Sequence, residues 1–407
     1  MRVLGRRLAA LLLVTGVGAA AACGSEPAAA VTDPEVDLAA LDVGGYNTQP
    51  KEFQPKNRVM VARFFEAQRM AGFIPAPFEI DPSLRVNQTT TTHAFLEPEE
   101  GKSTLAMHTF LKSDGFNSDT KGFVAGFAST GQTDDDPNIG NALSTSVLLF
   151  ESDSAATAAA AALSVREFQE PYDRSPNVVE TLKSAVHANA VVRWQPSKQA
   201  LAAWYSTGRY VIVTIAQSEE NRVLKVSDKD LLLNLADKSI TATSDRLRSF
   251  QPTPVDQLAT MELDPTGMYR RTLWRTSEDY YHGPPGVYSL AGDLHLMSEP
   301  AELRAQYDEA GVDAVSWGAT RVIRAKDIDA AQRLREQLSY DKYFRTAAGP
   351  AALPSARCAT YVGPSTGAIP NYCWVSRDRY VAMAWGEQMS DVQQRISAQY
   401  ALLVNSR

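Results

Sequence analysis

Two stretches of the chain carry the same arrangement of apolar and polar positions. Residues 204–211 and 374–381 both read W-x-S-x-x-R-Y-V, at an offset of 170 residues. In each stretch a short polar segment separates two apolar runs rich in β-branched and aromatic residues, a pattern typical of paired strands. Gly208 in the first copy and Asp378 in the second supply the turn chemistry between the strands. The pattern therefore predicts two β-hairpins related by an internal duplication.

Each predicted hairpin leads into a segment with apolar residues at helical spacing. These segments are residues 228–250, with Asp228 as a candidate N-cap, and residues 390–404, with Ser390 in the same role. Upstream of each hairpin, an apolar strand precedes another helical segment. The strands are 144–150 and 314–323, and the helices that follow them are 153–168 and 327–338. The predicted unit is thus β-α-β-β-α, and it occurs twice.

The two units predict an α+β fold in which helices cover one face of each antiparallel sheet. We expect a ferredoxin-like sandwich for each unit. The expected N-terminal domain spans residues 37–250 and the C-terminal domain residues 272–407, joined by a proline-bearing connection at 251–271. Ahead of the first unit, the less regular pattern predicts one helix and two strand-like pieces, at residues 57–72, 93–110 and 123–127.

The first 22 residues have the three-part layout of a secretory signal peptide. The basic residues Arg2, Arg6 and Arg7 are followed by the apolar stretch 8–17 and by the small residues 18–22. This apolar stretch is shorter than the roughly 20 residues that a membrane-spanning helix requires. We therefore expect residues 1–22 to direct export. Both the general and the twin-arginine export routes stay open, although the residues after Arg6-Arg7 match the second pattern only weakly.

Cys23 directly follows Ala20, Ala21 and Ala22, and this order is similar to a bacterial lipobox. Such a motif implies that a diacylglycerol is attached to the thiol and that the chain is cleaved before the cysteine, so that two or three acyl chains anchor it. Ala20 stands where lipoboxes more often have leucine. The alternative is ordinary cleavage after Ala22, which would leave a free thiol exposed to oxidation. We expect lipidation of Cys23, with residues 23–36 as a flexible tether that spans roughly 20 Å.

The charge balance bears on the partners of the exported chain. The sequence has 40 Lys and Arg against 47 Asp and Glu, and loss of three arginines with the signal leaves a net charge of −10. No basic run is present. Since nucleic-acid binding requires neutralisation of phosphates, we expect no nucleic-acid partner. After the signal no run approaches 18 apolar residues, so the body of the protein is expected to be soluble.

Motifs for catalysis or metal binding have little support. Residues 363–367 match the G-x-S-x-G nucleophile pattern, but Pro370 follows where that fold needs a helix, and no histidine lies after His295. The five histidines, which form no H-x-x-x-H pair, are His93, His108, His187, His282 and His295.

The acidic stretch 134–141 lacks the glycine and glutamate of a calcium-binding EF-hand loop, so a solvated turn is expected there. No phosphate loop or dinucleotide fingerprint occurs in the sequence. We therefore expect no catalytic residue, no cofactor and no metal.

Of the three cysteines, the two that are not expected to carry a lipid can pair with each other. With Cys23 lipidated, Cys358 and Cys373 are the only thiols left in an oxidising compartment, where disulfides persist. Closing a loop of about 15 residues contributes roughly 3 kcal/mol to stability in the entropic model. A redox-active pair is the alternative, but the spacing is far from C-x-x-C. We therefore predict a structural Cys358–Cys373 disulfide.

Three short tracts carry a resemblance to a known family. Residues 36–46, 68–72 and 77–79 are similar to the mature start of a family of cell-envelope lipoproteins from mycolic-acid-bearing actinobacteria. The function of that family is unknown, and no catalytic residue is carried over from it. The hairpin-and-helix units also loosely resemble the topology of extracellular sensor-like domains of mycobacterial lipoproteins and kinases.

The sequence therefore favours an exported lipoprotein without enzymatic activity. We expect it at the extracytoplasmic face of the cell membrane, held there by its lipid anchor, where it binds an envelope ligand or protein between its two α+β units. One alternative is an envelope hydrolase whose site comes from residues scattered along the chain. Another is a structural or assembly role in the envelope.

Overall fold

The computed structural model describes residues 36–98, 111–112, 114–171, 175–275, 285–339, 342–363 and 369–406. The predicted signal peptide, Cys23 and nearly all of the predicted tether lie outside the described residues. So does part of the strand-like piece expected at 93–110. Val36–Arg407 forms one unit by its internal contacts.

The first half of this unit is built on an antiparallel sheet. Its strands follow the order β1-β3-β4-β8-β7-β6-β5, and β2 pairs with β3 beside β1. The strands are β1 Val86–Asn87, β2 His93–Phe95, β3 Phe123–Gln132, β4 Asn141–Phe150, β5 Glu180–Leu182, β6 Val191–Gln195, β7 Ala200–Thr207 and β8 Tyr210–Ser218.

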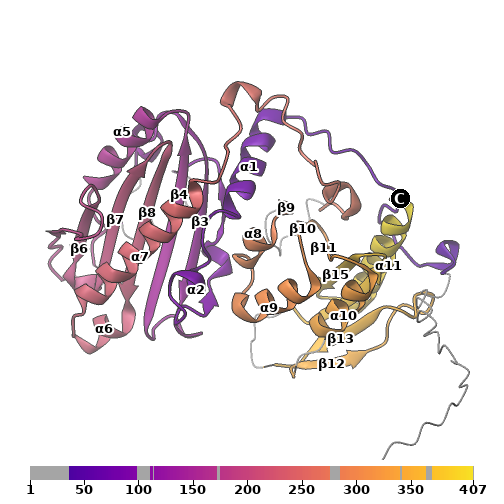
Figure 1. Cartoon of the computed structure of the whole chain (residues 1–407). Coiled ribbons are helices and arrows are strands. Elements are labelled where there is room, and N and C mark those ends of the chain that lie inside the picture. The colour runs from indigo at the N-terminus through magenta and orange to yellow at the C-terminus, as the bar shows by residue number, and fades with distance from the viewer. Residues whose placement is uncertain are drawn as a thin grey trace, which may run out of the picture. The chain divides into compact units, whose positions relative to one another are not determined.

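The second half contains another antiparallel sheet, with the order β12-β13-β14-β15-β11-β10-β9. The strands are β9 Gly286–Tyr288, β10 Ala314–Trp317, β11 Arg321–Arg324, β12 Phe344–Ala347, β13 Arg357–Tyr361, β14 Asn371–Arg377 and β15 Tyr380–Gly386. Figure 1 shows the two sheets with the helices that accompany them.

The helices complete the two halves. In the first half they are α1 Arg58–Ala71, α2 Pro77–Ile80, α4 Phe116–Asp119, α5 Asp153–Ser164, α6 Glu219–Leu224 and α7 Lys229–Leu247. In the second half they are α8 Leu290–Leu294, α9 Pro300–Ala310, α10 Ile328–Leu338 and α11 Met389–Asn405. The predicted α+β class with two related antiparallel units is therefore confirmed.

The two sheets share one topology. Six consecutive strands of the first sheet, β3-β4-β8-β7-β6-β5, correspond in order to β10-β11-β15-β14-β13-β12 of the second. In each half a helix follows the second of these strands, since α5 follows β4 and α10 follows β11. A long helix, α7 or α11, comes after β8 or β15, the strand that is last along the chain in its half. The hairpins also share their register, since Trp204 faces Val213 across β7 and β8, as Trp374 faces Met383 across β14 and β15. These matches support the internal duplication.

The two hairpin turns have the same backbone conformation although their residues differ. Gly208 has φ +51° and Asp378 has φ +50°, so both residues adopt the left-handed conformation. Glycine enters this region without a steric penalty, and Asp is among the few other residues that tolerate it. The same backbone shape is thus reached by the two residue types that the sequence pattern singled out.

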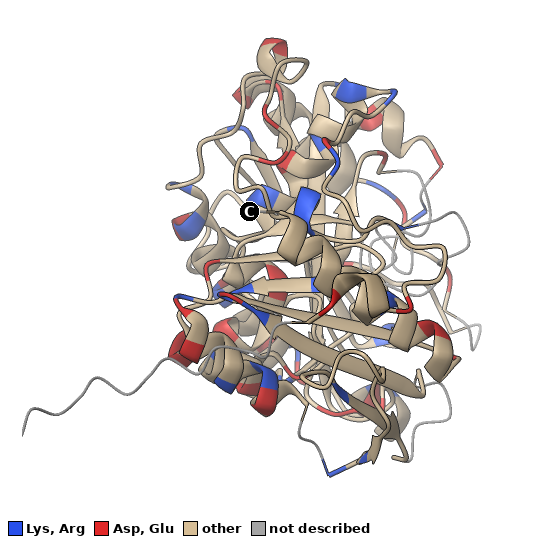
Figure 2. Ribbon diagram, turned by 90° about the vertical axis from the view of Figure 1, so that its right-hand side faces the viewer, with Lys and Arg blue, Asp and Glu red and all other residues tan. Residues whose placement is uncertain are grey.

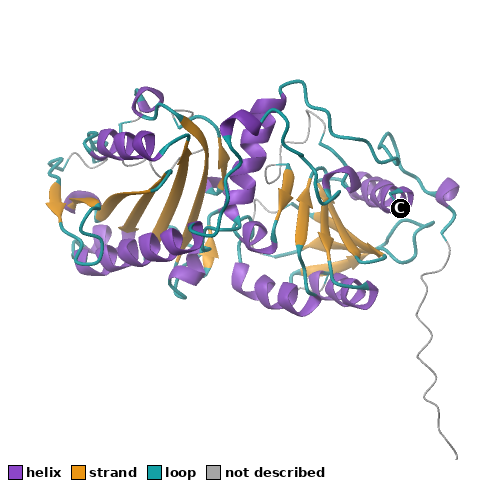
Figure 3. Ribbon diagram, turned by 45° about the horizontal axis from the view of Figure 1, so that its top comes forward, coloured by secondary structure: helices purple, strands orange, loops and turns teal. Residues whose placement is uncertain are grey.

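The expectation that the helices cover one face of each sheet is wrong, because they cover both (Figure 3). In the first half, α5 packs with Val211, Val213 and Ile215 of β8, whereas α7 packs with Ile212 and Ala216 on the opposite face. In the second half, α10 and α11 likewise fall into separate core clusters. Strand β8 is apolar on both faces, and a sheet of this kind needs cover on each side.

Each unit also has strands that the β-α-β-β-α pattern did not contain, and the single strand expected at 314–323 is two antiparallel strands, β10 and β11. Strands β5 and β6 lie between α5 and the first hairpin, and β12 and β13 hold the same place in the second half. They extend each sheet beyond the hairpin. The antiparallel unit is therefore wider than the four-stranded ferredoxin-like arrangement that we expected.

One of the two helix caps expected from the sequence, Asp228, is confirmed. The side chain of Asp228 accepts a hydrogen bond from the Leu231 amide at the start of α7, at 3.0 Å. Asp327 caps α10 in the same way. Helix α11 differs, because Gln388 occupies its N-cap position and Ser390 lies within the first turn.

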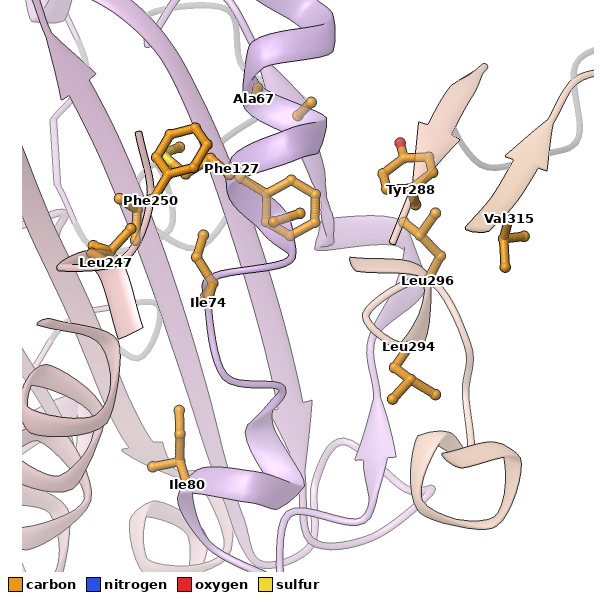
Figure 4. Packing of buried hydrophobic residues seen from close by; sticks show 14 of the residues in the cluster. Ala67, Ile74, Ile80, Phe127, Leu247, Phe250, Tyr288, Leu294, Leu296 and Val315 are labelled. Atoms are coloured by element: carbon orange, nitrogen blue, oxygen red, sulfur yellow. The ribbon is translucent and has the colours of Figure 1, made fainter. Parts of the chain in front are cut away.

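The two halves of the unit are joined by a common hydrophobic core. Figure 4 shows Ala67 of α1 and Phe127 of β3 in the same cluster as Tyr288, Leu294 and Val315 from the second half. Polar contacts cross the same junction. Gln68 Nε2 donates to the Tyr288 hydroxyl at 2.8 Å, with Gln68 fully buried. Side chains of both halves therefore pack together at the junction.

Candidate functional site

Cys358 and Cys373 form a disulfide in the second sheet. They stand directly opposite each other on β13 and β14, with Cα atoms 4.1 Å apart. Both are buried, and their side chains belong to the core cluster under α11. This pairing agrees with the prediction. The bridge ties together two strands that form the floor of a cavity on the other face of the sheet.

The cavity lies where the C-terminal end of α10 passes over β12, β13 and β14. Its volume is about 570 Å³. It is lined by Glu336, Gln337, Ser339, Phe344, Thr346, Arg357, Cys358, Ala359 and Trp374. We call it the α10 cavity.

Strand register brings the floor of the α10 cavity together. Arg357 faces Trp374 across β13 and β14, and Thr346 faces Ala359 across β12 and β13. Because side chains alternate along a strand, these four residues and Phe344 share one face of the sheet. The lining thus comes from three neighbouring strands and one helix end, which are rigid elements of the fold.

Aromatic rings make up much of this floor. The Phe344 ring lies 5.3 Å from the Trp374 ring and 5.2 Å from the Tyr372 ring, and Tyr372 stacks on Trp374 at 5.8 Å. Burial, together with the nearby Tyr361, raises the pKa of Tyr372. These contacts fix the rings in place. A ligand would therefore meet a preformed apolar surface.

Charged groups surround the aromatic floor. Glu336 accepts a hydrogen bond from Arg335 at 2.6 Å and lies 3.6 Å from Arg357. Arg335 also donates to Ser376 Oγ at 3.2 Å, which ties α10 to β14. About half of each of the Glu336 and Arg357 side chains is exposed. Both groups can therefore turn towards a polar ligand.

One buried donor of the α10 cavity has no protein acceptor. Trp374 is 1% exposed, and its indole Nε1 makes no hydrogen bond within the described part of the chain. A buried donor without an acceptor costs about 1–3 kcal/mol. An acceptor supplied by a ligand would remove that cost, so Trp374 is a candidate contact.

Two family models match the chain, and together they extend over almost all of the described unit. The first, Domain of unknown function (DUF7373) N-terminal, matches residues 53–263. The second, Domain of unknown function (DUF7373) C-terminal, matches residues 268–406. The protein belongs to the DUF7373 family. No curated protein matches the chain. The α10 cavity lies within the DUF7373 C-terminal domain.

Comparison of the two DUF7373 halves shows how the α10 cavity differs from its counterpart. Counted from the N-caps Ser152 and Asp327, Arg335 and Glu336 of α10 hold the places of Ala160 and Ala161 in α5. Ala160 is buried with Trp204 in an apolar cluster. The duplicated halves therefore share a backbone plan, but charged side chains replace alanines where α10 passes over Trp374.

The other sequence candidates do not form a site in the described part of DUF7373. No group of three or more His, Cys, Asp or Glu side chains there could hold a metal ion. His187 bonds to Thr241 Oγ1 at 2.8 Å, whereas His93 is in β2. The acidic stretch is a turn in which Asp134 and Asp136 accept hydrogen bonds from backbone amides two residues on.

Some of these candidates fall outside the described residues. They are His108, His282 and most of the G-x-S-x-G stretch, residues 364–367. Within the described helices, none is long and apolar enough to cross a membrane.

His295 is buried at the junction of the two halves, in keeping with the expectation of a surface or hydrogen-bonded core histidine. Its Nδ1 lies 2.7 Å from Ser129 Oγ, and its Nε2 lies 3.0 Å from the Ile74 carbonyl. Since a carbonyl only accepts, Nε2 carries the proton and Nδ1 accepts from the serine. Burial lowers the pKa of His295 to about 4. The pair is sealed from solvent and stabilises the junction.

Sequence reasoning missed the α10 cavity altogether. Its strands β12 and β13 are short, and its charged residues look like an ordinary exposed helix end. The signal that was present is aromatic: Phe344, Tyr361 and Tyr372 cluster within a short part of the chain around Trp374. The α10 cavity lies within the second half, whereas we expected ligand binding between the two units, and that expectation stays a prediction.

Proposed function

We propose that this DUF7373 protein is an exported, lipid-anchored binding protein of the cell envelope that holds its ligand in the α10 cavity. The observation that carries the proposal is the α10 cavity itself, with its volume of about 570 Å³. Ligand sites typically span about 300–1,000 Å³ and combine an apolar, aromatic lining with a few polar groups. Phe344 and Trp374 fit the first requirement, and Glu336 and Arg357 fit the second.

The placement at the membrane rests on the start of the sequence. Residues 1–22 read as a signal peptide, and Cys23 follows alanines as a lipidated cysteine does. The similarity of residues 36–46 to envelope lipoproteins of mycolic-acid-bearing actinobacteria supports the same location. We therefore place the binding domains at the extracytoplasmic face of the cell membrane, tethered by residues 23–36.

Charge distribution favours a small ligand or a protein over a nucleic acid. Figure 2 shows Lys and Arg interspersed with Asp and Glu over the described chain. A surface of mixed sign does not provide the continuous positive potential that a phosphate backbone needs.

The test is recovery of a bound small molecule from the full-length protein. The protein is produced with its own signal, extracted from membranes in detergent, and analysed by mass spectrometry under native and denaturing conditions. Arg357→Ala and Glu336→Ala should lower recovery of the ligand. Arg345→Ala is the matched control, since Arg345 is exposed on β12 between the lining residues Phe344 and Thr346 but alternates to the other face of the sheet.

Two results would overturn the proposal. One is a parent protein that carries no small molecule when it is taken from the envelope of its own host. The other is equal recovery from the parent, both cavity variants and the control.

A further inference from the structure

The segment that follows the predicted tether lies along helix α11. We call residues 37–51 the N-terminal strap. Asp42 accepts a hydrogen bond from Gln394 at 3.0 Å, and the Tyr46 hydroxyl donates to Asp391 at 2.6 Å. Further along, Asn405 donates to the Thr48 carbonyl at 2.8 Å.

These contacts use one face of α11. Positions 391, 394, 398, 402 and 405 recur at intervals of three and four residues, which places them in one row along the helix. Ala398 and Leu402 of this row pack with Val43 and Tyr46 of the strap. The strap is therefore part of the folded unit, although it precedes residue 53, where the first family model begins.

A second cavity lies beneath the far end of the strap. Its volume is about 250 Å³. It is lined by Gly45, Tyr46, Asn47, Gln49 and Lys51 of the strap, and by Arg270, Thr272, Leu273, Trp274 and Leu402 of the second half. Since half of the lining comes from the strap, the cavity exists only while the strap lies on α11. We call it the strap cavity.

One wall of the strap cavity is apolar and fixed. Leu273 and Leu402 are almost fully buried. The Trp274 indole donates to the Tyr269 carbonyl at 3.2 Å and stacks on the Tyr269 ring at 5.8 Å. Phe53 packs edge-on against Trp274 at 5.5 Å. The ring of Trp274 is thus held rigidly, as a surface for a flat or compact apolar group.

Two cations also line the strap cavity. Lys51 and Arg270 are both exposed, and neither side chain forms an ion pair with a carboxylate of the described residues. No Asp or Glu lines the cavity. One cation belongs to the strap and the other to the body of the second half. An anion between them would be attracted from both sides.

We propose that the strap cavity binds a small organic anion, a carboxylate or phosphate on a compact apolar body, and that binding fixes the strap on α11. A volume of about 250 Å³ equals roughly eight water molecules, which suits a ligand of about ten non-hydrogen atoms. The apolar body packs against Trp274, and the anionic group lies between Lys51 and Arg270.

Binding and strap docking are coupled because the ligand contacts residues of both the strap and the second half, Lys51 among the first and Trp274 and Arg270 among the second. A ligand that binds only the docked strap shifts the equilibrium towards that state. The strap leads directly to the tether, so the ligand controls how much free chain separates the folded unit from residue 23. This inference concerns a different cavity from the α10 cavity and does not depend on the function proposed for it.

The test uses the full-length protein in detergent micelles, with phenylacetate as the anionic probe and 2-phenylethanol as its neutral analogue. Binding is followed by calorimetry, and strap docking by hydrogen exchange of the amides of residues 44–48. Phenylacetate at saturation should slow exchange of these amides by at least about fivefold, the lower end of ordinary coupling. The neutral analogue should have no effect.

Matched variants test the two cations. Lys51→Gln and Arg270→Gln should each weaken binding of phenylacetate by roughly three- to fivefold, the size expected for an exposed charge pair. Lys56→Gln, which removes an exposed cation outside the cavity, should bind like the parent. Equal binding of the neutral analogue, absence of binding by phenylacetate and phenyl phosphate, or unchanged affinity in both cavity variants would each overturn the site. Binding without slower exchange at 44–48 would overturn the coupling.

Discussion

Trp204 and Trp374 occupy equivalent places in the two sheets, and each has an indole N–H without an acceptor in the described chain. Each of the two residues has only 1% of its surface exposed. Their surroundings differ, because Trp204 lies in an apolar cluster with the alanines of α5, whereas Trp374 lines the α10 cavity. The pair therefore allows the binding role proposed for Trp374 to be compared with a purely structural one.

We predict that Trp204→Phe and Trp374→Phe have similar effects on stability but different effects on ligand recovery. Each change removes buried volume without breaking a hydrogen bond, so each should cost about 1–2 kcal/mol, less than the roughly 3–5 of a Trp→Ala change. Unfolding in urea, followed by circular dichroism, measures this. Only Trp374→Phe should reduce the ligand recovered from the envelope. Equal recovery from both variants would contradict a role for the Trp374 indole.

His295 should make stability depend on pH. Its folded pKa of about 4, lowered by burial, lies below the value of 6.5 for an exposed histidine. Above pH 6.5 its contribution is complete. As the pH falls from 6.5 to 4, the unfolded chain binds a proton that the folded protein does not, so the free energy of unfolding decreases. At 1.36 kcal/mol per pKa unit, the loss amounts to about 3 kcal/mol.

The measurement is urea unfolding at several pH values between 4 and 7.5, in the parent and in His295→Gln. The variant should be less stable at pH 7, because it loses part of the contact with Ser129 and the Ile74 carbonyl, but its stability should fall less steeply with acid. Glu79 and Arg246 act on His295 in opposite directions and remain in both proteins. Parallel pH profiles for the two proteins would show that another group is responsible.

The buried ion pair of the second half should be among the most sensitive places in the fold. Asp293 and Arg321 are almost fully buried and bonded to each other, and Trp317 Nε1 donates to Asp293 at 2.6 Å. Asp293→Asn leaves the guanidinium without its counter-charge, which should cost about 3–5 kcal/mol. Asp313→Asn is the control, since its pair with Arg324 is partly exposed and should be worth about 0–1 kcal/mol. A similar loss of stability in both variants would show that the buried pair contributes no more to the free energy of unfolding than the partly exposed pair does.

The two hairpins and the N-cap of helix α7 could be predicted from the sequence because their signals are local. Gly208 and Asp378 mark the turns, and Asp228 marks a helix start, each within a few residues of the structure it determines. The placement of helices on both faces was also encoded, in the mostly apolar run of β8, where Val211, Ile212, Val213, Ile215 and Ala216 point to both faces. A strand with one buried face would instead alternate strictly between apolar and polar residues.

The rest of the fold depends on contacts between distant parts of the chain. Gln68 looks like a solvent-facing position of α1, but its partner Tyr288 is 220 residues away. Glu66 is completely buried, and its carboxylate accepts a hydrogen bond from the distant backbone amide of Thr253 at 2.7 Å. The α10 cavity has the same character, since it arises where a helix end passes over three strands. No single stretch of the sequence contains it.

Thiol chemistry tests the disulfide and the lipid anchor together. In the mature, unreduced protein we expect no free thiol, since Cys358 and Cys373 are bonded to each other and Cys23 carries a lipid. Reduction should release two thiols and lower the free energy of unfolding by about 3 kcal/mol, for a loop of 15 residues. Two reactive thiols before reduction would contradict the disulfide, and one would contradict lipidation.

The variant Cys23→Ser then tests the lipid anchor separately from the disulfide. This variant should lose the acyl mass and leave the membrane fraction, because two or three acyl chains supply the binding to the bilayer, while its disulfide stays intact. Ser25→Ala, two residues away, should stay in the membrane fraction with its lipid. Mass spectrometry and fractionation measure both. A Cys23→Ser protein that remained membrane-bound and labelled with palmitate as strongly as the parent would remove the lipid anchor from the proposed function, without affecting the α10 cavity.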